Sequence, residues 1–141
     1  MAKWLDETIA VSPQISVADV AEAKDNGIRT IINNRPDGEQ PGQPTAAEIG
    51  EAAKAAGLGY VHIPVDHSGY SMAQVEAMTA ALAEPGPVLA FCRSGTRSTF
   101  LWSLARGAAG EEPAEIAAKA ANAGYDVSPL MPTIESLRPK G

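Results

Sequence analysis

The chain of 141 residues contains one cysteine, two histidines and few aromatic side chains, which make up 5% of its residues. A single thiol can neither form an internal disulfide nor cycle with a second cysteine, so we expect a reducing compartment, the cytoplasm. One cysteine and two histidines make no cluster of metal ligands, and we expect neither a metal nor another cofactor. No apolar run approaches the length of a signal-peptide core or of a membrane span, so we expect no membrane partner.

Positive charge is also scarce, because the formal net charge is −6 and no stripe of lysine and arginine appears. This balance argues against nucleic acid as a partner. Hydrophobic residues make up 45% of the chain and charged residues 20%, a composition typical of folded proteins. The length suffices for one domain with a full core, so we predict a single domain over residues 1–141. The sequence leaves the oligomeric state open.

Short apolar runs alternate with helical patterns along the whole chain. Ser16, Thr45 and Ser71 each stand where a helix cap is expected, and the last two are followed three residues later by Glu or Gln. The alternation predicts an α/β domain with a mainly parallel central sheet flanked by helices. The predicted strands are 8–11, 28–33, 60–65 and 88–91, and the predicted helices are 16–25, 45–56, 71–83, 98–106, 113–123 and 129–137.

The only cysteine stands at the exit of one of these predicted strands. Cys92 follows the apolar run 88–91 and precedes the sequence Arg-Ser-Gly-Thr-Arg-Ser, after which a helix is predicted. Helix N-termini and nearby cations favour anions and ionised thiols, and Arg93 and Arg97 supply full positive charge. A structural cysteine in a core would not need two arginines beside it. We therefore interpret Cys92 as a nucleophile beside an anion-binding loop.

Each residue of this loop has a predicted part in holding an oxyanion. Successive backbone N–H groups from Arg93 through Ser94, Gly95 and Thr96 to Ser98 would bind it, and the side chain of Arg97 would add a planar two-pronged donor. The hydroxyl of Ser98 could donate to the sulfur and help it leave in a second half-reaction. The alternative for Ser98 is the role of helix N-cap.

Two other loops should open beside Cys92, because the carboxyl ends of parallel strands meet at one edge of the sheet. Asp66 is the predicted general acid, with organisation of the turn before the next helix as its alternative. His67 is a weaker candidate for contact with the substrate. Arg35 could add positive charge for a substrate, or could be a solvated loop arginine.

Three segments together resemble a known family: 31–39 (Ile-Ile-Asn-Asn-Arg-Pro-Asp-Gly-Glu), 63–66 (Ile-Pro-Val-Asp) and 91–98 (Phe-Cys-Arg-Ser-Gly-Thr-Arg-Ser). They resemble the bacterial phosphatase-like domain that occurs alone or fused to a metallo-β-lactamase-like hydrolase, over about residues 3–110. That domain is similar in fold to the dual-specificity and tyrosine phosphatases. The resemblance implies that Cys92 forms a phosphocysteine, Arg97 binds phosphate, Asp66 is the general acid and Ser98 is the hydroxyl that follows the arginine.

Two features of the loop are instead similar to rhodanese-type sulfurtransferases. Four residues separate Cys92 from Arg97, one fewer than tyrosine phosphatases usually have, and Phe91 precedes the cysteine where they usually have histidine. Asp66 favours phosphoester hydrolysis, since sulfur transfer through a persulfide needs no acid. Three hypotheses therefore stay open: a phosphatase acting on phosphotyrosine or an aryl phosphate, a thiosulfate or polysulfide sulfurtransferase, and a non-catalytic anion-binding module.

Overall fold

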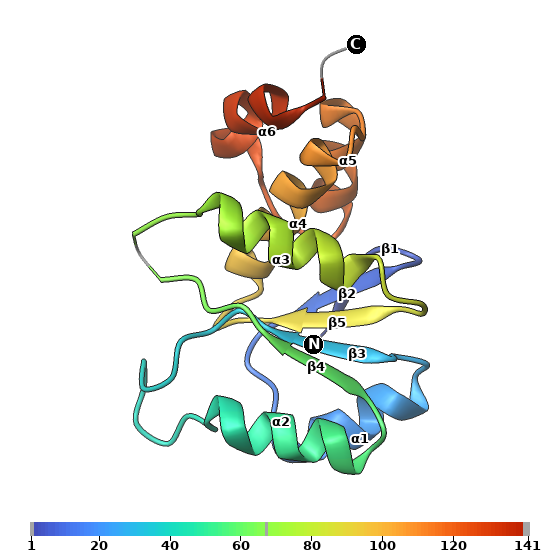
Figure 1. Cartoon of the computed structure of the whole chain (residues 1–141), viewed down its shortest axis with the longest axis vertical. Coiled ribbons are helices and arrows are strands. Elements are labelled where there is room, and N and C mark those ends of the chain that lie inside the picture. Colours follow the sequence, from blue (N-terminus) through green and yellow to red (C-terminus); the bar gives the residue numbers. More distant parts are fainter. Residues whose placement is uncertain (1, 67, 140–141) are drawn as a thin grey trace.

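A five-stranded sheet with helices on both faces forms the centre of the computed structural model, which describes residues 2–66 and 68–139 (Figure 1). The strands are β1 (Lys3–Asp6), β2 (Ile9–Ser12), β3 (Thr30–Asn33), β4 (Gly59–His62) and β5 (Val88–Phe91). The helices are α1 (Val17–Asp25), α2 (Ala46–Ala55), α3 (Met72–Leu82), α4 (Thr96–Ala108), α5 (Pro113–Asn122) and α6 (Met131–Leu137), with a short 3-10 turn η1 (Ser128–Leu130). The predicted α/β architecture is confirmed.

The strand order is β1-β2-β5-β3-β4, in which β1 runs antiparallel to β2 and the other neighbours are parallel. The sequence did not predict β1. Only Leu5 of this strand is buried, so the apolar pattern is too weak to mark a strand. The hairpin that joins β1 to β2 is held by Asp6, whose carboxylate accepts from the backbone N–H and the hydroxyl of Thr8.

The three predicted caps begin their helices as expected. The hydroxyls of Ser16, Thr45 and Ser71 accept from the backbone three residues later, and each of those residues returns a side-chain hydrogen bond to the cap. Helix α4 differs from its prediction, because it begins at Thr96 with Gly95 as its N-cap. Ser98 therefore lies inside the first turn, and its alternative role as the N-cap is wrong.

Four parallel strands end level with one another, which sets where the loops emerge. In the sheet register Phe91 is opposite both Ser12 and Asn33, and Asn33 is opposite His62. The chain runs outward from β3 to β4 through α2 on one face and returns to β5 through α3 on the other (Figure 1). The central strand β5 thus ends where the direction of winding reverses, which is where ligand sites form in such sheets.

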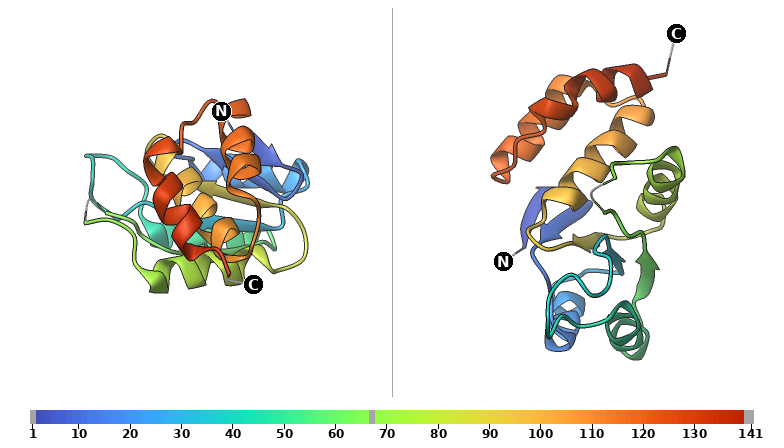
Figure 2. Two further views of the ribbon diagram at one scale, coloured as in Figure 1. Left: turned by 90° about the horizontal axis from the view of Figure 1, so that it is seen from above. Right: turned by 90° about the vertical axis from the view of Figure 1, so that its left-hand side faces the viewer.

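Two hydrophobic cores flank the sheet. One lies under α1 and α2 and includes Ile31, Ile49 and Phe91, whereas the larger one is built with α3, α4, α5 and α6. Helix α4 extends away from the sheet, and α5 and α6 pack along it (Figure 2). Among the described residues, no helix has the length and apolar character that crossing a bilayer requires.

The packing of α6 on α4 depends on a glycine. A Cβ atom at Gly107 would lie 2.8 Å from a methyl carbon of the buried Ile134 and 3.1 Å from its carbonyl oxygen. We expect Gly107→Val to lower the free energy of unfolding by ~1–3 kcal/mol, because overpacking must push α6 away. Urea unfolding measures this loss. Ala118→Val, on the exposed face of α5, is the matched control, and equal losses in both variants would contradict the packing.

Candidate active site

The candidate nucleophile lies at the end of β5, in residues 92–97, which we call the catalytic loop after the role that the sequence predicts for it. The backbone N–H of Cys92 donates to the carbonyl of Ser12 at 3.3 Å, which ties the start of the loop to β2. The sulfur accepts from the backbone N–H of Gly95 at 3.1 Å. Cys92 is 0% exposed, so its sulfur is covered in this structure and yet faces a polar donor of the loop.

Arg97 reaches from the first turn of α4 to the loops that follow β3 and β4. Its Nη1 and Nη2 donate to the two carboxylate oxygens of Glu39, each at 2.8 Å, and Nη1 also donates to the carbonyl of Val65 at 2.7 Å. A guanidinium has more donors than these. Within residues 2–66 and 68–139, Nε–H and one Nη2–H on the adjacent edge have no acceptor, so this edge can hold an oxyanion in two-pronged fashion.

A single carboxylate joins two arginines at this edge of the sheet. Glu39 accepts from Arg97 and also from Nε of Arg35 at 2.8 Å. Hydrogen bonds from Arg97 and then Arg35 lower the pKa of Glu39 to about 2, against the opposing effect of burial. The hydrogen bond to Glu39 is also the main reason that the pKa of Arg97 is raised, with the negative charge of Cys92 adding to it.

The structure shows what sequence reasoning missed about the loop 34–44. The sequence predicts no role for Glu39, which lies in this loop. The available signal was its place four residues after Arg35, within the Arg-Pro-Asp-Gly-Glu segment. Only the fold brings Glu39 to Arg97, 58 residues later in the chain.

Arg35 is 1% exposed, so the alternative of a solvated loop arginine is wrong. Besides Glu39, its guanidinium donates to Gln14 at 3.0 Å and to Gln40 at 2.9 Å. Its carbonyl lies 3.0 Å from Nε2 of His62. The observed contacts make Arg35 a support for Glu39, and its direct contact with a substrate stays a prediction.

Asp66 lies at the exposed end of the segment that follows β4. Its carboxylate accepts from the backbone N–H of Ser68 at 2.8 Å and from the hydroxyl of Ser68 at 2.5 Å, which organises the turn as one interpretation predicted. The contact of Arg97 with the neighbouring Val65 brings this segment beside the catalytic loop. The acid role of Asp66 stays a prediction, and His67 lies outside the described residues.

The remaining loop residues line the turn from β5 into α4. Arg93 and Ser94 are exposed, and the hydroxyl of Ser94 donates to that of Thr96 at 3.0 Å. Ser98 is 0% exposed, and its hydroxyl has no hydrogen-bond partner among the residues that the structure describes. Its capacity to donate is therefore unused within the part of the chain that the structure describes.

The charge of Cys92 acts on two tyrosines that the sequence did not single out. Burial and the charge of Cys92 raise the pKa of Tyr70 to about 12, although Arg97 opposes the shift. Burial and the charge of Cys92 also raise the pKa of Tyr125. The ring centroids of Tyr70 and Phe100 lie 6.4 Å apart, and the hydroxyl of Tyr125 donates at 3.1 Å to the carbonyl of Ser94, in the loop that follows Cys92.

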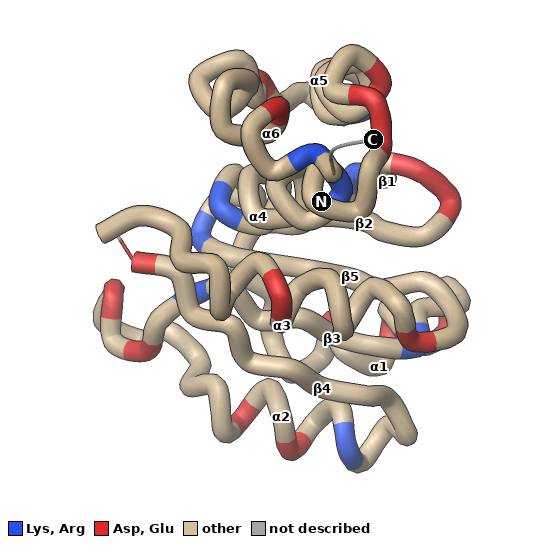
Figure 3. The backbone as a smooth tube through the Cα atoms, turned by 45° about the horizontal axis from the view of Figure 1, so that its top comes forward, with Lys and Arg blue, Asp and Glu red and all other residues tan. Residues whose placement is uncertain are grey.

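Charge is distributed unevenly around this edge of the sheet. Basic segments lie at the end of α4 that meets the sheet, and acidic segments lie on the loops beside it (Figure 3). Among the described residues, no group of three or more His, Cys, Asp or Glu side chains is placed to hold a metal ion.

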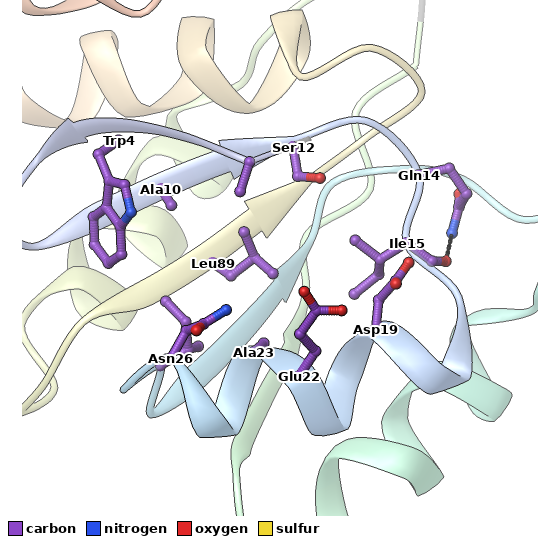
Figure 4. A pocket seen from close by; sticks show the side chains of 12 residues that line it. Trp4, Ala10, Ser12, Gln14, Ile15, Asp19, Glu22, Ala23, Asn26 and Leu89 are labelled. Carbon is purple, nitrogen blue, oxygen red and sulfur yellow. Dashed lines mark hydrogen bonds between the residues drawn. The ribbon is translucent and has the colours of Figure 1, made fainter.

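A pocket of about 620 Å³ lies away from the cysteine, between α1 and the face of β2 and β5 (Figure 4). Its floor is apolar and includes Ala10 and Leu89, whereas Asp19 and Glu22 stand on its rim. Gln14 lines this pocket and also contacts Arg35, because its side-chain oxygen accepts from the Arg35 guanidinium at 3.0 Å.

Comparison with known proteins identifies the family of this chain. The sequence profile of the phosphatase-like domain of beta-lactamase hydrolase-like proteins matches residues 2–110. The chain belongs to this family of phosphatase-like domains. A beta-lactamase hydrolase-like protein of Agrobacterium fabrum is 40% identical over 101 residues, which cover 71% of this chain and 23% of that protein. The match thus spans less than a quarter of the relative.

Solved structures extend the similarity of this phosphatase-like domain to its whole length. A candidate phosphatase from Neisseria meningitidis Z2491 is 37% identical with a TM-score of 0.79, covering 96% of this chain and 97% of that one. Kinase-associated phosphatase, crystallised with its catalytic-site cysteine replaced by serine, is 14% identical with a TM-score of 0.72, covering 96% and 92%. The fold of the cysteine phosphatases is therefore shared, including by the segment after residue 110.

The pairing of Glu39 predicts how the stability of this phosphatase-like domain depends on pH. The folded pKa of about 2 lies below the ordinary 4.5, so the stabilisation is complete above about pH 4.5 and is lost as the pH falls toward 2. We expect Glu39→Gln to remove most of this acid-induced loss and to lower the free energy of unfolding at neutral pH by ~1–3 kcal/mol. Urea unfolding at a series of pH values measures both effects.

Glu111→Gln is the matched control, because Glu111 also bridges two cations, Arg106 and Lys119, away from the catalytic loop. This variant should retain the loss of stability in acid that protonation of Glu39 causes. A Glu39→Gln chain that loses stability in acid as steeply as the wild type would contradict the assignment.

Proposed function

We propose that the chain is a cysteine-dependent phosphatase that hydrolyses phosphotyrosine or other aryl phosphoesters through a phosphocysteine intermediate. The observation that carries the proposal is the placement of the Cys92 sulfur and the Arg97 guanidinium on one loop at the centre of the sheet. The sulfur accepts from the Gly95 N–H at 3.1 Å, and Arg97 keeps one donor edge available within the described residues. Membership of a phosphatase-like family supports the same reaction.

In the first step the Cys92 thiolate attacks phosphorus, so a sulfur–phosphorus bond forms as the bond to the leaving oxygen breaks. The backbone N–H groups of the catalytic loop and the available edge of Arg97 hold the equatorial oxygens, where negative charge concentrates. Asp66 gives its proton to the leaving phenolic oxygen. Because Cys92 is 0% exposed, the side chains that cover its sulfur have to move as the substrate enters.

In the second step water attacks the phosphocysteine, and the Asp66 carboxylate takes a proton from that water. The sulfur–phosphorus bond breaks and Cys92 leaves as a thiolate. Ser98 donates its hydrogen bond to the departing sulfur, a role supported by its buried hydroxyl, which has no partner among the described residues. Products are inorganic phosphate and the phenol released in the first step.

The substrate class is supported by an aromatic pair, Tyr70 and Phe100, whose tyrosine responds to the charges of the site. Tyr70 stands close enough to Cys92 and Arg97 for its pKa to respond to both, and its ring packs with Phe100. Aromatic side chains pair favourably with a flat ring, and an aryl phosphate offers one. The curated relatives are longer than the matched region, which covers 23% of the protein from Agrobacterium fabrum. An aryl phosphoester substrate for a protein of that length is therefore also a proposal.

A sulfurtransferase is the second candidate, and the observation that favours it is the short spacing of Cys92 and Arg97. In that reaction the Cys92 thiolate takes the outer sulfur of thiosulfate, sulfite leaves, and a thiol acceptor then removes the sulfur. A terminal sulfur needs less room than a phosphoryl group inside a tight loop. Asp66 would have no part in this reaction.

Cys92→Ser separates these functions. We expect the variant to lose aryl phosphate hydrolysis by on the order of 10³-fold or more, because an alcohol at this place is a far poorer nucleophile than a thiolate. It should still bind phosphate or tungstate, since the loop donors remain. Initial rates with an aryl phosphate and calorimetric titration with the anion measure both properties.

The wild-type chain is also incubated with thiosulfate and a thiol acceptor, and its mass is recorded. A gain of one sulfur atom on Cys92, together with no phosphate release, would replace the phosphatase by the sulfurtransferase. Anion binding with neither turnover nor sulfur gain would leave the non-catalytic module.

Asp66→Asn tests the general acid. We expect hydrolysis to slow by about 10²–10⁴-fold with a leaving group that needs protonation, and far less with an activated phenol. Asp6→Asn is the matched control, because Asp6 accepts from the backbone N–H and hydroxyl of Thr8 just as Asp66 does from Ser68. Equal rates for Asp66→Asn and wild type across a series of phenols would remove Asp66 from the reaction.

A further inference from the structure

The peptide group between Ser94 and Gly95 has both of its polar ends engaged. Its N–H, on Gly95, donates to the sulfur of Cys92 at 3.1 Å. Its carbonyl, on Ser94, accepts from the hydroxyl of Tyr125 at 3.1 Å. Since the N–H and C=O of a trans peptide point in opposite directions, the two hydrogen bonds together fix the orientation of this group.

Glycine at position 95 leaves that orientation weakly determined by the backbone alone. Rotation of the peptide group changes the φ of Gly95, which is +92° here, and glycine adopts positive and negative φ with similar ease. A rotated group would turn its carbonyl toward the sulfur and remove the donor. The hydrogen bond from Tyr125 opposes this rotation.

Tyr125 is placed against this peptide by the C-terminal part of the chain. A Cβ atom at position 95 would lie 2.2 Å from the Tyr125 hydroxyl, so the hydroxyl lies directly on Gly95. Tyr125 stands between α5 and η1 and packs its ring against the core that α4, α5 and α6 share. It lies beyond residues 2–110, the part that the family profile matches.

We propose that Tyr125 is a positioning residue for the nucleophile: its hydroxyl holds the Ser94–Gly95 peptide so that the Gly95 N–H faces the Cys92 sulfur and favours the thiolate. The inference rests on the proposed function, because the orientation of this donor matters to a reaction only if Cys92 is the nucleophile. It makes the segment after α5 part of the site, acting on the nucleophile through the Ser94–Gly95 peptide.

The test is alkylation of the only cysteine by iodoacetamide in the full chain, from about pH 5 to about pH 9, where thiolates of differing stability are told apart. Tyr125→Phe keeps the ring and removes the hydroxyl. We expect its half-maximal alkylation rate at higher pH than in the wild type, and a rate near neutral pH that is about two- to tenfold lower.

Other groups face the sulfur but do not change in this variant. Tyr70 approaches it from the segment before α3, and Arg97 approaches it from α4, where its charge is balanced by Glu39. Arg93 and Asp66 lie on the two adjoining loops. A displaced pH profile in Tyr125→Phe therefore reports the orientation of the peptide group.

Tyr60→Phe is the matched control, because the Tyr60 hydroxyl accepts one hydrogen bond from Asn33 at 3.1 Å on the α2 side of the sheet. This variant should keep the wild-type alkylation profile. An unchanged profile in Tyr125→Phe, or an equal displacement in both variants, would overturn the proposal.

Aryl phosphate hydrolysis, measured on the same samples, separates the two claims. A displaced alkylation profile in a chain that hydrolyses no phosphoester supports the positioning of the thiol and rejects the phosphatase. An active enzyme with an unchanged profile rejects the positioning alone. In the wild type, hydrogen exchange of the Gly95 amide gives a measurement that needs no variant: slow exchange supports the bond to sulfur, and exchange as fast as in an exposed loop overturns the proposal.

Discussion

The level register of four parallel strands is the constraint on which the candidate site depends. Because β2, β5, β3 and β4 end opposite one another, Ser12, Phe91, Asn33 and His62 bring four loops to one edge of the sheet. Cys92 follows the central strand, so its neighbours come from both sides. Arg97 can then contact the residues after β3 and after β4 at the same time, which no single segment of the chain could arrange.

Charge balance at this edge follows from the burial of cations. A guanidinium that is 1% exposed, such as that of Arg35, is costly unless it has hydrogen-bonded partners. Glu39 supplies the countercharge for Arg35 and Arg97 together, and one donor edge of Arg97 has no acceptor within residues 2–66 and 68–139. The same carboxylate therefore limits the positive charge at the loop while it holds the arginine in place.

The C-terminal helices and the residues between them are a second group of elements that contact the loop after Cys92. They pack on α4 rather than extending the sheet, and they carry Tyr125 to the outer side of the catalytic loop. A loop built around glycine can take the conformation that directs an N–H at sulfur, but the same freedom lets it leave that conformation. The hydrogen bond from Tyr125 joins a distant part of the chain to the loop at this point.

The sequence by itself determined the architecture and the centre of the candidate site. Capping residues and apolar runs act locally, so Ser16, Thr45 and Ser71 marked their helices, and the segment 88–98 marked the loop with its cysteine and arginines. The strand at 3–6 could not be predicted from the sequence, because only one of its residues is buried and a single apolar position shows no alternation. The tertiary structure alone decided that Cys92 is covered, that Glu39 pairs with Arg97, and that Tyr125 contacts the loop that follows Cys92. These depend on contacts between residues far apart in the chain, and the register of the sheet and the docking of α5 and α6 bring such residues together.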